Sequence, residues 1–170
     1  MTFTIQSSAF ADGQAIPSRH SCEGDNVSPL LSWSGQPEGT QSFALIVDDA
    51  DAPSPWKFFT HWVMFNIPAN VEGLPEAVPA RERLENGAIQ GVTGIGKMGY
   101  YGPCPLPGNP HRYRFTLYAL DTTLNLRPRA TKEQVLNAMS GHVIGETLLT
   151  GTYKLRLRAY GKVLWKQFFG

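Results

Sequence analysis

The chain has 170 residues, of which 42% are hydrophobic and 17% charged, so it is long enough for one domain with its own hydrophobic core. Its formal net charge of +1 argues against nucleic acid as the main partner, because binding to a phosphate backbone depends on a surplus of Lys and Arg. The first residues have no basic start, and no stretch of about 18 apolar residues follows. We therefore expect one soluble, cytoplasmic domain over residues 1–170.

Short segments of strand-like composition alternate with turn signals from the N-terminus onward. They are rich in β-branched and aromatic residues or alternate between apolar and polar residues, and loops rich in Gly, Pro, Asp and Asn separate them. This spacing predicts an antiparallel β-sandwich. The expected strands cover residues 3–6, 30–33, 42–47, 61–67, 88–92 and 112–120.

The patterns change towards the C-terminus. Thr131 opens a run in which apolar residues recur at helical spacing as far as Val143, although Gly141 weakens the second half of this helix. Residues 146–154 return to a strand-like pattern. The segment 156–170 fits two structures, because its first part alternates like a strand while VLWKQFF fits a short helix or an arm. The expected fold is mainly β, with one or two short helices near the C-terminus.

Two histidines stand at or beside the start of an expected strand. In HRYRFTL, the two-residue period of a strand places His111 and Tyr113 on one face, next to a loop rich in Gly and Pro. The same period groups His61 with Val63 and Phe65 on an inward face of HWVMFNI. A single His or Tyr at a strand end is more often a hydrogen-bonded edge residue than part of a ligand site.

Aspartates follow a third strand end. In VDDADAPSP, Asp49 and Asp51 share a side if the chain is extended there, although these acids could instead form a solvated turn. Each of three strand ends then presents a titratable group beside a Gly/Pro loop. This repetition favours one functional pocket over three unrelated edges.

These segments also carry a family resemblance. In order along the chain, DADAPS, HWVMFN and GPCPLPGNPHRY resemble the three signature segments of the phosphatidylethanolamine-binding protein family, also called Raf kinase inhibitor-like proteins. The stretch CEGDNVSPLLSWSGQPEGTQSFALIV is similar to the bacterial and archaeal branch, so the resemblance runs from about Thr4 to Tyr153. Ala50 and Cys104 stand where many members have proline.

The resemblance implies an antiparallel β-sandwich with Greek-key strands and an anion-binding pocket at one end. Carried over position by position, it implies that Asp49 is the pocket carboxylate, that His61 and His111 are its histidines, and that Tyr113 is its tyrosine. Gly102 and Pro103 then fall on the rim of the pocket. The expected ligand-binding residues are Asp49, Asp51, His61, Gly102, Pro103, His111 and Tyr113.

Such a pocket predicts a binding protein and not an enzyme. A phosphate needs convergent donors, which histidine N–H groups, the Tyr113 hydroxyl and backbone amides of residues 99–108 can supply. Asp49 would fix a histidine tautomer or accept a proton from a phosphate hydroxyl or an ammonium group. The expected guest is a small phosphate-bearing ligand, a lipid head group or a phosphorylated residue of a partner, bound in a regulatory or inhibitory role without a cofactor.

Other functions stay open. The family includes inhibitors of serine proteases and of kinases, so exposed loops could act on such a partner. Two histidines and an aspartate could hold a metal, although no H-E-x-x-H pattern is present. Cys104 lies seven residues before His111 and could form a nucleophilic Cys/His pair, as in a hydrolase. The glycine-rich stretch GVTGIGKMGYYG lacks the spacing of nucleotide-binding loops.

The two cysteines, Cys22 and Cys104, match no metal-binding or redox motif. A cytoplasmic location favours reduced thiols. The resemblance, however, implies that the loops of the two cysteines converge. We therefore expect two structural cysteines at the rim, either free or joined in a disulfide.

The C-terminal segment 154–170 is basic and aromatic. It contains five of the 15 Lys and Arg residues and none of the 14 Asp and Glu residues, so it carries +5 while the remainder carries −4. Packing on the core or on a twin subunit is expected ahead of contact with an anionic membrane, which would be peripheral at most. Because bacterial relatives resemble dimers, a homodimer is expected. The apolar residues concerned are Leu164, Trp165, Phe168 and Phe169.

Overall fold

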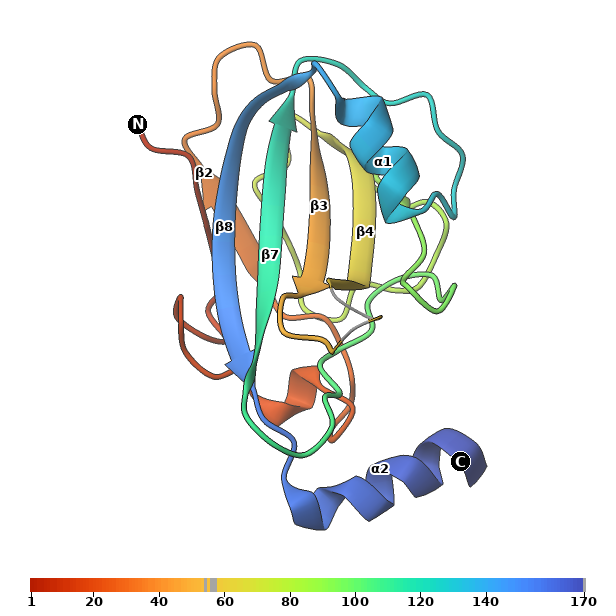
Figure 1. Ribbon diagram of the computed structural model, residues 1–170. Coiled ribbons are helices and arrows are strands. Elements are labelled where there is room, and N and C mark those ends of the chain that lie inside the picture. The colour runs from red at the N-terminus through yellow and green to blue at the C-terminus, as the bar shows by residue number, and fades with distance from the viewer. Residues whose placement is uncertain (54, 56–57, 170) are drawn as a thin grey trace.

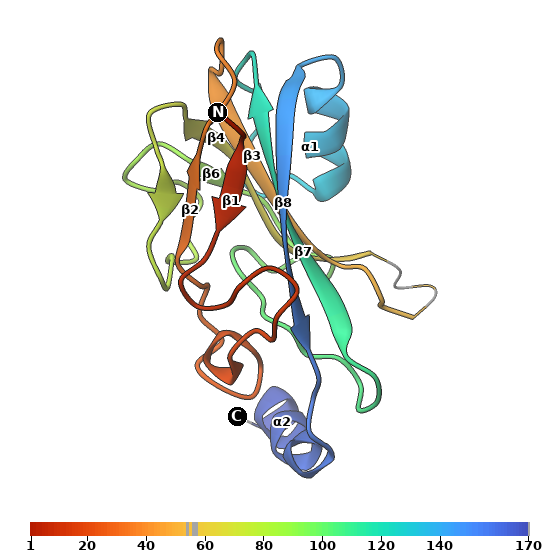
Figure 2. The ribbon, with the colours of Figure 1, turned by 90° about the vertical axis from the view of Figure 1, so that its left-hand side faces the viewer.

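The computed structural model of the chain describes residues 1–53, 55 and 58–169, and of residues 157–160 and 168 it describes the backbone alone. Two antiparallel sheets form a sandwich (Figures 1 and 2). The smaller sheet has the order β1 (Thr4–Gln6), β2 (Leu31–Ser34), β5 (Gly73–Leu74). The larger sheet has the order β6 (Ile89–Gln90), β4 (Phe59–Pro68), β3 (Ser42–Asp49), β7 (His111–Leu120), β8 (Val143–Tyr153). The described helices are α1 (Lys132–Met139), α2 (Leu157–Phe169) and a 3-10 turn at Ser18–His20.

The larger sheet is built around β3, which pairs with β4 on one side and with β7 on the other. β3 and β4 form one antiparallel pair and β7 and β8 another, while β6 lies outside β4. The chain must therefore cross from β4 through β6 to the far side of β3, which is the kind of crossover that Greek-key strands make. The expectation of a mainly β, antiparallel sandwich is confirmed.

Both faces of the larger sheet are covered, so β3 is buried along its whole length. The inner face packs against the smaller sheet, and its core includes Trp33, Phe43, Trp62, Phe115 and Leu117. The outer face packs under α1, and its core includes Ala44, Ile46, Val63, Phe65 and Val135. This second layer of packing explains why β3 reads as a continuous hydrophobic run.

The six expected strands are present with shifted ends, and β5 was not expected. The run 88–92 forms only the two-residue strand β6. The expected helix stops at Met139, and β8 already begins at Val143. Gly141 has a φ of +81° between them, a backbone conformation that reverses the chain and suits glycine. The extension of the helix to Val143 was therefore wrong.

The C-terminal segment is helical from Leu157 onward, so the strand-like interpretation of its first part was wrong. Val163 of α2 is buried in the inner core. Figure 1 shows α2 at the end of the sandwich where β3 ends and β7 begins. The expectation for the Phe168 side chain falls outside the described residues. No helix in the described part of the chain is long and apolar enough to span a bilayer.

Candidate functional site

A cavity of about 360 Å³ opens at the end of the larger sheet. Asp49 at the end of β3, His61 on β4, and His111 and Tyr113 at the start of β7 all line it. The four groups that the sequence placed in one pocket therefore share one cavity. The other described residues of its lining are mainly apolar: Ala52, Pro53, Phe59, Ile95, Tyr101, Cys104, Pro105 and Leu106.

A β-bulge directs His61 into this cavity. In the pairing of β3 with β4, Val47 faces Trp62 and Asp48 faces Thr60, so His61 is the extra residue between two successive pairs. Trp62 packs in the inner core, and the bulge lets its neighbour His61 point to the same side. The predicted grouping of His61 with Val63 and Phe65 was wrong, because those two residues pack under α1.

The imidazole of His61 is held by Tyr101. Its Nδ1 lies 2.6 Å from the Tyr101 carbonyl oxygen, and because a carbonyl can only accept, Nδ1 carries the proton. The two rings are stacked with centroids 5.6 Å apart. Burial lowers the pKa of His61 to about 4, against the opposing effect of the Tyr101 carbonyl. At neutral pH His61 is therefore uncharged, and its Nε2 is an acceptor.

Asp49 holds the second histidine. Its Oδ2 lies 2.7 Å from the Nδ1 of His111, and its Oδ1 accepts a 2.9 Å hydrogen bond from the backbone amide of Asp51. Both carboxylate oxygens are thus engaged within the protein. This arrangement fixes the His111 ring with Nδ1 protonated, the role that the sequence suggested for an aspartate in an anion site.

The Tyr113 hydroxyl is buried, and among the described residues it has no partner within strict hydrogen-bond geometry, although the Asp49 carboxylate is close enough to interact with it. Burial, and next the nearby Asp49 carboxylate, raise the pKa of Tyr113. The hydroxyl therefore keeps its proton at any physiological pH. A protonated hydroxyl in a cavity lining can donate a hydrogen bond to a polar group in the cavity.

Gly102 and Pro103 are buried and do not line the cavity. They fasten the rim loop to the loop around residues 17–28: the Gly102 amide donates to Asn26 Oδ1 at 2.8 Å, and the Pro103 carbonyl accepts from the Cys22 amide at 3.1 Å. A Cβ on Gly102 would lie 2.1 Å from the His20 carbonyl oxygen. These contacts position the rim loop against the loop around residues 17–28.

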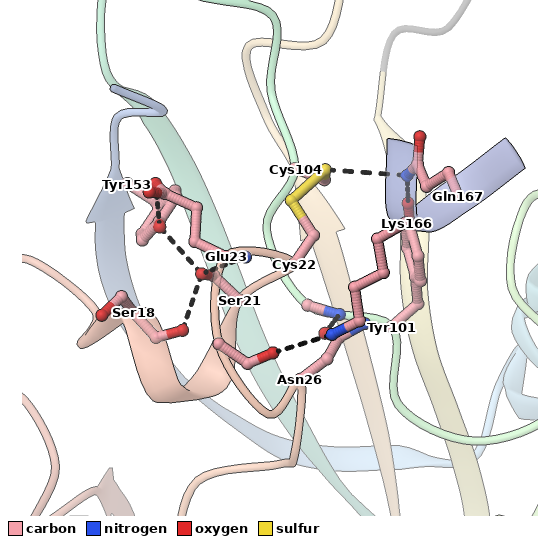
Figure 3. The surroundings of a disulfide bond; sticks show 12 residues. Ser18, Ser21, Cys22, Glu23, Asn26, Tyr101, Cys104, Tyr153, Lys166 and Gln167 are labelled. Carbon is pink, nitrogen blue, oxygen red and sulfur yellow. Dashed lines mark hydrogen bonds between the residues drawn. A yellow bond between two sulfur atoms is a disulfide. The ribbon is translucent and has the colours of Figure 1, made fainter. Parts of the chain in front are cut away.

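Cys22 and Cys104 form a disulfide between the same two loops, with a Cα–Cα distance of 5.4 Å (Figure 3). The sequence left two states open, free or joined, and the structure has the joined one, because the loops converge closely enough for a bond. Cys104 also lines the cavity. As half of a disulfide it has no thiol with which to act as a nucleophile.

Asp51 lies outside the cavity that Asp49 lines. It lines an adjoining cavity of about 600 Å³, which shares Pro53, Leu106 and His111 with the first. Its carboxylate is paired with Arg112, whose guanidinium donates to both carboxylate oxygens at 2.9 Å. This pairing lowers the pKa of Asp51 to about 2.

Sequence reasoning missed Tyr101, Phe59 and Asn26. Tyr101 acts through its backbone carbonyl and its ring, Phe59 packs edge-on against His61 with ring centroids 5.0 Å apart, and Asn26 acts on the rim through one hydrogen bond. No sequence motif marks any of these roles. The one available signal was YYG, in which Tyr101 lies directly before the rim residue Gly102. Within the described residues, no group of three or more His, Cys, Asp and Glu side chains is arranged to hold a metal ion.

Comparisons with known proteins match most of the chain. A family model described as phosphatidylethanolamine-binding protein matches residues 6–154. A UPF0098 protein of Methanothermobacter thermautotrophicus is 55% identical over 150 residues, which cover 88% of this chain and 97% of that protein. The solved structure of YbcL from Escherichia coli, described as a new member of the mammalian PEBP family, is 35% identical with a TM-score of 0.83 and covers 91% of this chain and 99% of its own. The solved structure of a phosphatidylethanolamine-binding protein homolog from Chlamydia trachomatis is 39% identical with a TM-score of 0.83, and it also covers 91% of this chain and 99% of its own.

Proposed function

Because the chain belongs to the phosphatidylethanolamine-binding protein family, we propose that its cavity is a non-catalytic receptor for the phosphate group of a small phosphate monoester. The observation that carries this proposal is that the polar side chains of Tyr113, His61 and His111 line one cavity, although they come from two different strands. A phosphate oxygen beside the Tyr113 hydroxyl would accept a hydrogen bond from it.

The two histidines complement that donor. Nδ1 of each ring is engaged by a protein oxygen, so each ring has Nε2 left for a guest. Neutral His61 offers an acceptor, which suits the P–OH of a singly ionised phosphate. His111 leaves its Nε2 for the same guest, beside the Asp49 carboxylate. The cavity thus matches a guest that carries both a hydroxyl and an anionic oxygen.

Among the described residues that line the cavity, Asp49 is the charged one, and it is negative. A doubly charged phosphate is repelled by this carboxylate more strongly than a singly charged one. We expect the monoanion to bind best, and hence affinity to fall as the second phosphate proton is lost near pH 6. His61, with a pKa of about 4, stays an acceptor throughout that range.

Calorimetric titration with O-phosphoethanolamine, O-phosphotyrosine and inorganic phosphate tests the proposal and separates head-group from phosphopeptide sources. Tyr113→Phe should weaken binding of the monoester at least tenfold, the cost of one lost hydrogen bond to a charged group. Tyr118→Phe is the matched control, because Tyr118 lies on the outer face of the same strand. Equal affinity of both variants and the original chain, or an affinity that is flat from pH 5 to 9, would contradict the proposal.

The compartment is a separate question. A cytoplasmic location stays part of the proposal, although the Cys22–Cys104 disulfide is more typical of oxidising compartments, with intracellular proteins of hyperthermophiles as the exception. Alkylation of intact cells before lysis, followed by mass spectrometry of the two cysteine peptides, measures the redox state in place. Fully alkylated cysteines would show that the disulfide does not form where the protein works.

A further inference from the structure

Helix α2 is an addition to the part of the chain that the relatives share. The family match ends at residue 154, and the methanogen protein has 97% of its length within the 150 matched residues, whereas α2 covers Leu157–Phe169. The function of α2 must therefore be sought in its own surface, and the shared pocket does not account for it.

One side of α2 rests on the body of the protein. Val163 is only 6% exposed in the inner core. Gln167 Nε2 donates to the Tyr101 hydroxyl at 3.1 Å and lies 3.8 Å from Cys104 Sγ, and Lys166 Nζ donates to the Gly24 carbonyl at 3.4 Å (Figure 3). Because Tyr101 and Cys104 line the cavity, α2 is attached beside the cavity wall.

The opposite side of α2 presents aromatic and basic side chains. With 3.6 residues per turn, position 165 lies nearly opposite Val163, and positions 162 and 169, one turn before and one turn after it, continue the same strip along one flank of the helix. Trp165 is 62% exposed and Phe169 76% exposed, and Lys162 is exposed as well. Two large exposed aromatic rings on one helix side are costly in water, which indicates a surface that becomes covered.

Charge indicates what covers it. Residues 154–170 carry +5 and the rest of the chain −4. Two copies of this helix brought face to face would place like charges together, which disfavours α2 pairing with α2. An anionic surface, in contrast, attracts the lysines and accepts tryptophan and phenylalanine at its interfacial layer.

We propose that the outward side of α2, defined by Lys162, Trp165 and Phe169, docks on an anionic lipid bilayer. The helix lies in the plane of the interface with Trp165 and Phe169 inserted among the lipid chains and head groups, and Lys162 remains at head-group level. Docking holds the end of the sandwich that contains the cavity against the membrane. The proposal does not depend on which guest the cavity binds.

Sedimentation of the full chain with lipid vesicles tests this docking. We expect binding to vesicles of phosphatidylcholine with about 30% phosphatidylglycerol and about fivefold weaker binding to phosphatidylcholine alone, since a lysine near the surface contributes about fivefold. The double variant Trp165→Ala, Phe169→Ala should bind at least tenfold more weakly. Its matched control is Ile144→Ala, Leu148→Ala, which removes two exposed apolar side chains from β8.

A charge variant separates attraction from insertion. Lys162→Gln should weaken binding to anionic vesicles about fivefold, while Arg81→Gln, an exposed position on the body, should leave it unchanged. Equal binding to neutral and anionic vesicles would overturn the proposal, and so would equal binding of the α2 variant and its control. Light scattering of the full chain measures whether it is a dimer. If the chain is a dimer that the Trp165/Phe169 variant converts to a monomer, and no vesicle binding is seen, the proposal is overturned and this side of α2 binds a second copy.

Discussion

His61 and Tyr101 are joined by two hydrogen bonds: His61 Nδ1 lies 2.6 Å from the Tyr101 carbonyl oxygen, and the Tyr101 amide donates to the His61 backbone carbonyl at 2.9 Å. The pair connects β4 to the rim loop and fixes the tautomer of a buried histidine. The hydrogen-bonding character of the cavity is thus set partly by a backbone carbonyl on its rim.

Protonation of His61 should make stability depend on pH. Burial lowers its pKa to about 4, whereas an unfolded histidine has a pKa of about 6.5. Between these values His61 binds a proton in the unfolded chain but not in the folded chain. The free energy of unfolding therefore falls as the pH drops from 6.5 to 4. The contribution is about 3 kcal/mol, and above pH 6.5 it does not change further.

Urea unfolding of the original chain and of His61→Gln at several pH values isolates this contribution. From pH 7 to pH 4 the original chain should lose about 3 kcal/mol of unfolding free energy relative to His61→Gln. His142→Gln is the control, because His142 is half exposed and pairs with Asp121 at the surface. A His61 variant whose stability tracks the original chain in parallel over this range would show that His61 is charged in the folded state.

Gly102→Ala should disrupt the rim. The added Cβ would lie 2.1 Å from the His20 carbonyl oxygen and 2.5 Å from Asn26 Oδ1, so the two loops must move apart at a cost of about 2 kcal/mol. Gly161→Ala is the control: its Cβ meets no atom within 4 Å, and alanine in a helix is about 1 kcal/mol better than glycine. Chemical denaturation should show a lower free energy of unfolding for Gly102→Ala and a higher one for Gly161→Ala. Two losses of similar size would contradict the rim contacts described above.

Removal of the disulfide should reduce stability more than it changes the pocket. Closing a loop between residues 82 positions apart contributes about 4 kcal/mol in the chain-entropy account. Three hydrogen bonds join the same loops without it: Cys22 to Pro103, Gly102 to Asn26, and Tyr100 to the His20 carbonyl. The Cys22→Ser, Cys104→Ser variant should therefore unfold at lower urea yet bind phosphate esters within about threefold of the original affinity. Lost binding by a folded variant would mean that the disulfide itself shapes the cavity.

Two neighbouring aspartates should respond very differently to the loss of their cations. Asp48 is buried, its pKa is raised by burial, and Lys132 Nζ lies 3.0 Å from its carboxylate. Lys132→Met leaves that charge unpaired and should cost about 3 kcal/mol at pH 7.5. Asp51 and Arg112 are paired at the surface, where solvent screens the pair, so Arg112→Met should lower the urea midpoint much less than Lys132→Met does. Urea midpoints compare them, and equal losses would contradict the difference in burial.

The sequence predicted the pocket because its polar groups stand at strand ends beside Gly/Pro loops. Tyr113 follows the simple two-residue period of β7, with Phe115 and Leu117 in the same core. His61 reached the cavity for a different physical reason, a bulge between β3 and β4. A bulge depends on the pairing between two strands, which the local alternation of one strand does not contain.

Other features depend on contacts between distant segments. Tyr101 contributes a carbonyl oxygen that every residue type has, so no motif marks it. The Cys22–Cys104 bond forms because two loops converge, and the argument from compartment pointed to the wrong redox state. Alternation in 156–160 suggested a strand, but helix α2 forms there, and burial of Val163 on the inner core holds it to the body.

The most direct test is a crystal of the protein soaked with O-phosphoethanolamine at saturating concentration. We predict electron density for a tetrahedral phosphate with one oxygen about 2.7 Å from the Tyr113 hydroxyl and with the Nε2 atoms of His61 and His111 also within hydrogen-bonding distance. Density for the phosphate elsewhere on the surface, with water or nothing beside that hydroxyl, would contradict the assignment of this cavity as a phosphate receptor.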